Sequence, residues 1–216
     1  MQAKNINIKE NIDDLDENSL VEIGVNSIER NFGGIQFDDK ERRSSVEIVK
    51  DIFNIKYPSV NVTKEYKVLQ RIKENLNDLN SRYLLVISKF SISSFLLSSI
   101  LEEENKEKTC YIGSKFKFNL NTVEYNLKVL NKIQAYMENG NILIMRDLES
   151  VYPSMYDLFN QNLIVLSNKN YIRLPIGSSV NNFSFVNDKF RCIVIVDLNQ
   201  INNEETSFLN RFEKQI

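Results

Sequence analysis

The chain has 216 residues, of which 42% are hydrophobic and 10% aromatic, so it has enough apolar material for a packed core and is not a disordered chain. A formal net charge of −2 excludes a broad basic surface for nucleic acid or anionic membrane, and no apolar run is long enough to predict a membrane span. The absence of histidine excludes histidine-based acid–base catalysis and histidine-ligated zinc within this chain. Because the first residues are polar and acidic, we do not expect them to be a signal peptide.

The first part of the chain predicts helices. Ser19–Phe32 carries apolar residues near one face and is followed by two glycines, which favour a helix end. A second amphipathic segment runs from about Asp39 to Phe53, and a third from Val62 to Asn80. We interpret the apolar stripes as core packing and predict a small helical subdomain over residues 1–78.

The pattern changes near residue 80, where short apolar runs begin to alternate with amphipathic segments. The runs predict buried strands, at Arg82–Ser88, Thr109–Gly113, Asn141–Met145 and Arg191–Asp197. The segments between them predict helices, at Ser91–Glu104, Thr122–Asn139 and Ser150–Asn160. This alternation predicts an α/β domain over residues 79–216, with a parallel sheet covered by helices.

Two segments depart from the alternation. Leu163–Gly177 contains two short apolar runs on either side of Ser167–Asn170, which predicts an inserted hairpin. The last segment begins near Thr206 and predicts a helix that contains Phe208–Lys214.

The cysteines and the central aromatic residues favour a structural interpretation. Cys110 and Cys192 each lie inside an apolar run, so we expect two buried thiols in a reducing compartment rather than a disulfide. Tyr152, Tyr156 and Phe159 have helical spacing and are expected to fill the core.

The first strand-to-helix turn is where an α/β sheet would hold phosphate. A working P-loop needs glycines whose backbone N–H groups wrap the phosphates, a lysine that reaches them, and a serine or threonine for Mg²⁺. The turn Ser88–Phe95, SKFSISSF, contains Lys89 but no glycine. We therefore expect no working P-loop there.

The end of the third predicted strand carries a candidate carboxylate. Asp147 and Glu149 follow ILIM, where an ATPase would place a metal-bridging acid and a water-orienting acid. Arg146 precedes them, and we expect it to pair with Asp147 and compete with a metal. The favoured interpretation is a buried strand that ends in a salt-bridged turn, although Asp147 as a remnant of a metal site stays open. The acidic run Glu102–Glu104 is interpreted as a solvated helix end.

Arg211 is the candidate for catalysis in trans. It follows the fourth predicted strand in ETSFLNRFEK, where a guanidinium could reach the γ-phosphate held by a neighbouring module. Spacing alone favours a surface arginine over this role.

Several segments together resemble one part of the mysterin family, giant ring-finger E3 ubiquitin ligases with a dynein-like AAA+ core: NSIERNFGG, SRYLLVISKF, ILIMRDLESVYPSMYDLFNQN, FRCIVIVD and FLNRFEK. The resemblance extends over about Asn26 to Lys214. It implies that residues 1–78 resemble the lid of one AAA+ module. Residues 79–216 would be the large α/β subdomain of the next module, with a degenerate P-loop.

The resemblance also implies roles for the candidate residues. The strand that ends at Arg146 and Asp147 would be a Walker B strand whose site is lost. Arg211 lies where the box carrying an arginine finger ends in related modules, and would serve the nucleotide of the preceding module. The chain is expected to act as a non-catalytic, structural and allosteric module of the ring.

Cofactors and partners would lie outside this chain. The resemblance implies ATP and Mg²⁺ in the neighbouring module, contacts with other AAA+ modules of a larger chain, the ubiquitination machinery as a partner of the parent protein, and a cytoplasmic location. No cofactor, metal or nucleic acid is expected in this chain. It departs from the family in having no RING, no zinc ligands and no lid after Ile216, so we expect a fragment or truncated product of a larger protein.

Two other hypotheses stay open. The chain could be an active P-loop-like ATPase, against which the Ser88–Phe95 turn argues. It could also be a free-standing α/β adaptor that binds protein partners through the Leu163–Gly177 hairpin. The non-catalytic hypothesis expects no ATP binding and an exposed apolar surface where neighbouring modules are missing.

Overall fold

The computed structural model describes residues 16–32, 45–58, 68–89, 97, 99–101, 109–113, 123–176, 183–201 and 206–215. The chain forms two compact units, Met1–Lys67 and Val68–Ile216. Helix α3 (Val68–Asn77) belongs to the second unit and contacts strand β8 (Glu213–Gln215), whereas the sequence grouped this helix with the first part of the chain. None of the described helices is both long and apolar enough to cross a membrane.

The first unit is a pair of helices, α1 (Glu17–Phe32) and α2 (Ser45–Lys56). Val21 and Val25 of α1 are buried and pack against Phe53 and Tyr57 at the end of α2. The two predicted helices are therefore confirmed, with α2 displaced toward the C-terminus of the predicted range.

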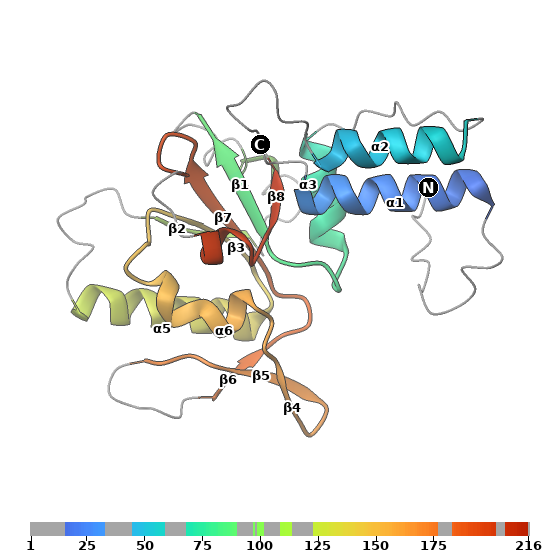
Figure 1. Cartoon of the computed structure of the whole chain (residues 1–216). Helices are drawn as coiled ribbons and strands as arrows, with labels where there is room; N and C mark the ends of the chain where they lie inside the picture. The colour runs from blue at the N-terminus through green and yellow to red at the C-terminus, as the bar shows by residue number, and fades with distance from the viewer. Residues whose placement is uncertain are drawn as a thin grey trace. The chain divides into compact units, whose positions relative to one another are not determined.

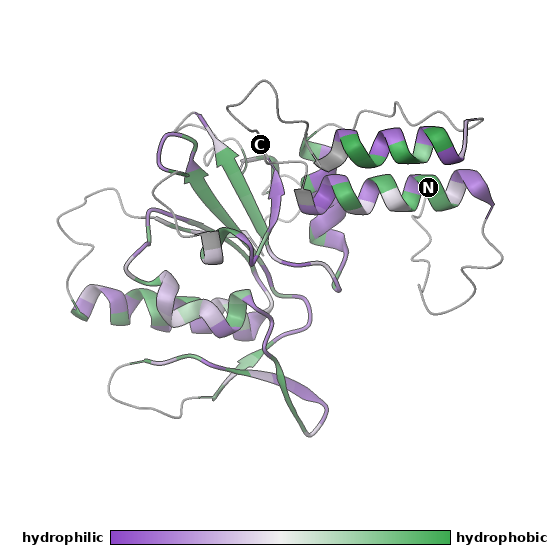
Figure 2. Cartoon of the chain, in the orientation of Figure 1, coloured by the Kyte–Doolittle hydropathy of each residue, from purple (hydrophilic) through white to green (hydrophobic). Residues whose placement is uncertain are grey.

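The second unit is built on a five-stranded parallel sheet with the order β2-β3-β7-β1-β8 (Figure 1). Four of its strands were predicted, and they now have these bounds: β1 Leu84–Ser88, β2 Thr109–Gly113, β3 Ile142–Arg146 and β7 Arg191–Asp197. The central strands β1 and β7 are almost entirely apolar (Figure 2), because both of their faces are covered. The predicted α/β fold is confirmed.

Each face of the sheet has its own core. On one face, Leu85, Leu143 and Val194 pack with α5 (Val123–Asn139) and with the short helices that follow β3. Those short helices are a 3₁₀ turn at Tyr152–Met155 and α6 at Tyr156–Phe159. On the other face, the alternate strand residues, Leu84, Val86 and Ile193, pack with Ile72 of α3 and with Leu97 and Leu101.

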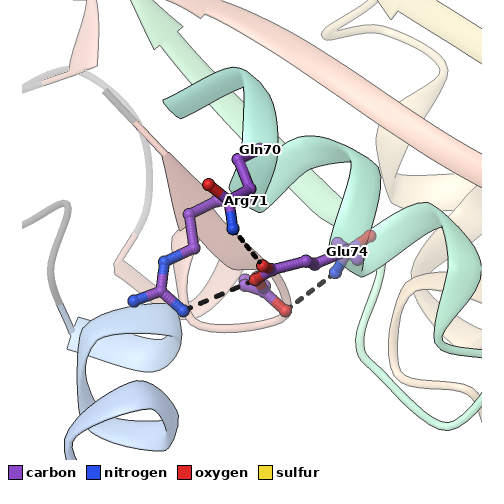
Figure 3. Close-up of polar contacts among 5 residues, drawn as sticks. Gln70, Arg71 and Glu74 are labelled. Carbon is purple, nitrogen blue, oxygen red and sulfur yellow. Dashed lines mark hydrogen bonds and ion pairs between the residues drawn. The ribbon is translucent and has the colours of Figure 1, made fainter. Parts of the chain in front are cut away.

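On helix α3, two side chains contact the carboxylate of Glu74. Gln70 Nε2 donates a hydrogen bond of 2.9 Å to Glu74 Oε1, and Arg71 Nη1 lies 3.7 Å from Glu74 Oε2 (Figure 3). Pairs at these helical spacings contribute about 0.2–0.5 kcal/mol each. They favour the helix that places Ile72 and Asn75 toward the sheet.

A second sheet of three antiparallel strands lies between β3 and β7 in the chain: β4 Ile164–Leu166, β5 Lys169–Arg173 and β6 Phe183–Val186. Ser167 and Asn168 connect β4 to β5 and have φ angles of 49° and 59°, typical of a two-residue hairpin turn. The predicted hairpin is confirmed, and β6 is an additional strand. Strand β6 contacts α5 (Figure 1).

The end of the chain differs from the prediction of one helix through Phe208–Lys214. Helix α7 covers only Thr206–Leu209, and the chain then enters strand β8. The Glu213 N–H donates to the Tyr83 carbonyl (2.9 Å) and Phe212 is fully buried. Pairing with β1 and burial of Phe212 outweigh the local helical pattern, so that prediction was wrong.

The two cysteines lie in one row across the sheet. Leu143 of β3 is in register with Cys110 on one side and with Cys192 on the other, and both thiols are free. Strands are spaced by about 4.8 Å, so the two cysteines are about 10 Å apart, beyond the reach of a disulfide. Cys192 is buried as expected, but Cys110 near the sheet edge is only half-buried.

Candidate functional site

The carboxyl edge of the parallel sheet is where an α/β domain of this kind binds ligands. Strand β3 reaches this edge at Arg146, which is in register with Gly113 of β2 and Ile195 of β7. The Arg146 Nε atom lies 3.4 Å from Asp147 Oδ2. The predicted ion pair is therefore present, and the Asp147 carboxylate faces a guanidinium of its own chain.

The backbone conformation of Asp147 is consistent with a turn at the end of β3. Asp147 has a φ of 53°, in the left-handed region that short polar side chains tolerate. Its side chain is 42% exposed, while that of Arg146 is 13% exposed. The strand thus ends in a polar turn in which the aspartate turns away from the regular strand direction.

A second carboxylate reaches the same edge at the end of β7. Asp197 is in register with Ser88 of β1, and Leu198 N–H donates to the Ser88 carbonyl at 3.0 Å. Asp197 Oδ1 accepts from the Asn199 N–H at 2.8 Å and from Asn199 Nδ2 at 3.0 Å. This carboxylate closes a local turn, a common arrangement for aspartate after a strand.

Mg²⁺ prefers carboxylate oxygens as ligands, and the two described carboxylates at this edge each have a partner within the chain. Asp147 is paired with a cation and Asp197 is engaged by its own turn. Within the part of the chain that the structure describes, no group of three histidine, cysteine or acidic residues could hold a metal ion.

The structure describes only some of the other candidate residues that the sequence indicated. Lys89 is exposed at the end of β1, but the rest of the Ser88–Phe95 turn lies outside the described residues, as do Glu102–Glu104. The expectation that no P-loop forms there stays a prediction. Glu149 is exposed, next to the Arg146–Asp147 pair in sequence.

Arg211 lies at the opposite edge of the sheet. It comes two residues before β8 begins, and β8 runs parallel to β1, so Arg211 lies near the amino ends of the strands. A five-residue strand is about 17 Å long, which is farther than an arginine side chain extends. Arg211 therefore cannot serve the carboxyl edge of its own sheet.

The Arg211 side chain lies on an aromatic ring. Its Cζ atom is 4.0 Å from the centre of the Tyr156 ring, a close cation–π contact. Its Nε atom is buried and has no hydrogen-bond partner. Among the described residues, the structure gives this guanidinium no hydrogen bond or ion pair, so its N–H donors are not used by a carboxylate.

The aromatic residues behind Arg211 form one cluster. Phe208 stacks on Tyr152 with ring centres 5.2 Å apart, and it makes edge contacts with Phe159 and Phe212 at 5.9 and 5.1 Å. Tyr152 and Phe159 are buried, as predicted for core residues. Burial raises the pKa of Tyr152 well above its ordinary value, with a smaller contribution from the Glu149 charge. Tyr156 is only half-buried and presents a face to Arg211, a role that its sequence spacing did not indicate.

A buried polar network lies along the same amino edge, around Arg191 at the start of β7. Its Nη2 atom donates to Asn75 Oδ1 at 2.9 Å and to Ser81 Oγ at 2.7 Å, and its Nη1 atom donates to the Ser81 carbonyl at 3.1 Å. The guanidinium also lies 5.3 Å from the centre of the Tyr83 ring. Burial lowers the pKa of Arg191, while nearby Tyr83, Asp78, Cys192 and Glu213 oppose this effect.

Sequence reasoning missed this network. Arg191 directly precedes the apolar run CIVIV, a position typical of a surface residue that flanks a strand. The available signal was Asn75, which lies three residues after Ile72 and so shares the apolar face of its helix. A polar residue on a buried face needs a partner, and that partner is distant in sequence.

The five-stranded parallel sheet, its two helical faces and its insertion before β7 define an α/β domain of the AAA type. Residues 73–216 match the family described as RNF213 AAA domain, and the chain belongs to this family. The resemblance to mysterin, which is RNF213, is thereby confirmed.

The relatives of this chain are much longer proteins, and this chain spans only a small part of each. Human (Homo sapiens) E3 ubiquitin-protein ligase RNF213 is 27% identical over 177 residues, which cover 76% of this chain and 3% of the relative. The mouse (Mus musculus) protein of the same name is 25% identical over 175 residues, with the same shares covered. Zebrafish (Danio rerio) E3 ubiquitin-protein ligase rnf213-beta is 27% identical over 193 residues, covering 86% of this chain and 4% of the relative.

Proposed function

We propose that this chain is a non-catalytic AAA module of an RNF213-like assembly. It binds no nucleotide itself and has a structural and allosteric role between neighbouring modules. It also donates Arg211 to an ATP site on a neighbour. ATP and Mg²⁺ belong to that neighbouring module, and the helical subdomain predicted over residues 1–78 acts as the lid of the preceding module. Ubiquitination partners and a cytoplasmic location, which the parent family implies, belong to the same proposal.

The observation that supports this proposal is the contrast between the carboxyl edge and the amino edge of the parallel sheet. At the carboxyl edge, Asp147 is paired with Arg146 and Asp197 Oδ1 closes its own turn, which supports the loss of a metal site there. At the amino edge, the Arg211 guanidinium rests on Tyr156 and meets no acid among the described residues. An arginine finger needs a fixed guanidinium whose charge and N–H donors remain available for phosphate.

Nucleotide binding by the isolated chain tests the first half of the proposal. Calorimetric titration with ATP and ADP in the presence of Mg²⁺ should give no binding heat. An Arg146→Ala variant frees Asp147 and serves to ask whether the ion pair alone blocks a metal. Micromolar binding by the unaltered chain would contradict a non-catalytic module and would favour an ATPase in its own right.

The ATPase rate of the assembly tests the second half. The assay uses this chain together with the hydrolysing module, whether that module lies in the same polypeptide or in another. Arg211→Ala should lower kcat by about 10³-fold or more, the range known for arginine fingers, with little change in KM for ATP. Arg173→Ala, at an exposed arginine of β5, is the matched control and should leave the rate unchanged. An unchanged rate in Arg211→Ala would remove the finger from the proposal.

A second candidate function is a free-standing adaptor that binds proteins through the β4–β5 hairpin. The observation that favours it is the exposed apolar surface of that hairpin, where Val165 is 65% and Leu166 50% exposed. A monomeric chain that binds neither nucleotide nor any neighbouring AAA module would support this candidate over the first.

A further inference from the structure

We infer that Tyr156 positions Arg211: its ring holds the guanidinium in a fixed place at the amino edge of the sheet while leaving its N–H donors unused. This inference rests on the proposed role of Arg211 toward a neighbour's nucleotide. It assigns Tyr156 a task beyond filling the core.

The first step is the contact itself. A cation within about 6 Å of an aromatic centre is attracted by the negative face of the ring, and Arg211 Cζ lies well inside that limit at 4.0 Å. Arg211 Nε is buried without a hydrogen-bond partner, so no side-chain hydrogen bond from that atom fixes the group. Among the described residues, the ring is the partner that the structure shows for this side chain.

The ring is itself firmly placed. Tyr156 is the first residue of α6, and its carbonyl accepts the Asn160 N–H at 2.9 Å. Its ring packs at 6.5 Å from the ring of Phe208, which is buried in the aromatic cluster. The surface under Arg211 is therefore a half-buried ring that packs against the core.

The backbone of Arg211 is fixed from the other side. Its N–H donates to the Phe208 carbonyl at 3.1 Å, and Arg82 Nη1 donates to the neighbouring Asn210 carbonyl at 2.8 Å. Phe208 thus contacts both the arginine backbone and the tyrosine ring. The turn at Phe208–Arg211 and the Tyr156 ring together restrict the positions that the guanidinium can adopt.

The choice of a ring over a carboxylate has a chemical consequence. A carboxylate would neutralise the guanidinium and occupy two of its N–H donors, whereas a ring face attracts the charge without accepting those donors in their plane. A group that must stabilise phosphate oxygens needs both charge and donors. An aromatic support therefore suits a residue that acts on another module.

The test measures ATP hydrolysis by the same assembly with three changes at position 156. Tyr156→Leu removes the ring, Tyr156→Phe keeps it, and Tyr156→pentafluorophenylalanine keeps its shape but removes the negative face. We expect kcat to fall about three- to thirty-fold in the first and third variants, to stay within about twofold in the second, and KM for ATP to stay unchanged. The fluorinated ring preserves the packing volume, so it answers the question even where Tyr156→Leu does not fold.

Arg211→Ala separates the possible failures. In that background Tyr156→Leu should have no further effect on kcat, because the residue that the ring positions is gone. If Arg211→Ala lowers kcat but the fluorinated ring does not, the positioning role is wrong and the finger stands. If Arg211→Ala leaves kcat unchanged, the finger is wrong and the positioning role falls with it.

Discussion

The Asn75 side chain donates a hydrogen bond of 2.8 Å to the carboxylate of Glu213, and this bond joins helix α3 to the last strand of the sheet. Both residues are buried, with exposed fractions of 0% and 3%. Asn75 also accepts from Arg191, so one side chain links α3, β7 and β8. Buried polar groups that satisfy one another in this way specify one arrangement of the elements that carry them.

Arg191 should be the most sensitive member of this network. Arg191→Met leaves the Asn75 and Ser81 acceptors buried without their donor, and we expect the free energy of unfolding to fall by about 3–5 kcal/mol. Urea unfolding followed by circular dichroism measures this change. Arg173→Met, at a side chain that is 65% exposed, is the control and should stay within about 0.5 kcal/mol of the unaltered chain. Equal effects at the two positions would show that the network contributes little.

Gly140 should not tolerate a side chain. It ends α5 with a φ of +73°, and an added Cβ would lie 2.8 Å from Cγ of Asn187. We expect Gly140→Ala to lower the thermal midpoint and to destabilise the chain by about 1–2 kcal/mol. Asn131→Ala, at an exposed position inside α5, should be neutral or stabilising. A neutral Gly140→Ala would mean that the helix end rearranges at little cost.

Phe159 is buried and Phe183 is exposed, so the same substitution at the two positions tests the effect of burial on stability. Phe159 is 1% exposed within the aromatic cluster, while Phe183 of β6 is 49% exposed. Phe159→Ala should cost about 3–5 kcal/mol because it leaves a cavity behind Arg211, and Phe183→Ala should cost less than about 1 kcal/mol. Denaturant midpoints at constant m-value report both changes. A large loss in Phe183→Ala would indicate that β6 is covered.

The buried thiol predicts a loss of stability at alkaline pH. Burial raises the pKa of Cys192 far above its ordinary value of 9.0, and the charge of Arg191 only partly opposes this. Below that value the folded and unfolded chains both keep the proton. Above it the unfolded chain releases a proton that the folded chain retains, so the free energy of unfolding falls by up to about 1.4 kcal/mol per pH unit.

Urea unfolding between about pH 8 and about pH 10.5 measures this slope. Cys192→Val should reduce it, and Cys110→Val should reduce it less because Cys110 is only half-buried. Tyr83 and Tyr152, whose pKa values burial also raises, should keep part of the slope in both variants. A slope that Cys192→Val leaves unchanged would contradict the assignment to the thiol.

The sequence by itself determined the class of the fold and the family. Continuous apolar runs such as Leu84–Ser88 and Arg191–Asp197 predict strands buried on both faces, because no other short element hides every side chain. The hairpin turn at Ser167–Asn168 and the Arg146–Asp147 pair were also accessible, because each depends on neighbours in the chain. Structure that depends on neighbouring residues can therefore be predicted from a short stretch of sequence.

Only the tertiary structure decided what depends on distant partners. Glu213–Gln215 is a strand because β1 offers a free edge for pairing, although the preceding residues have a helical pattern. Tyr156 faces Arg211 and Asn75 meets Glu213 because the sheet brings together segments far apart in the chain. Such contacts follow from strand order and register, which periodicity within a single segment does not encode.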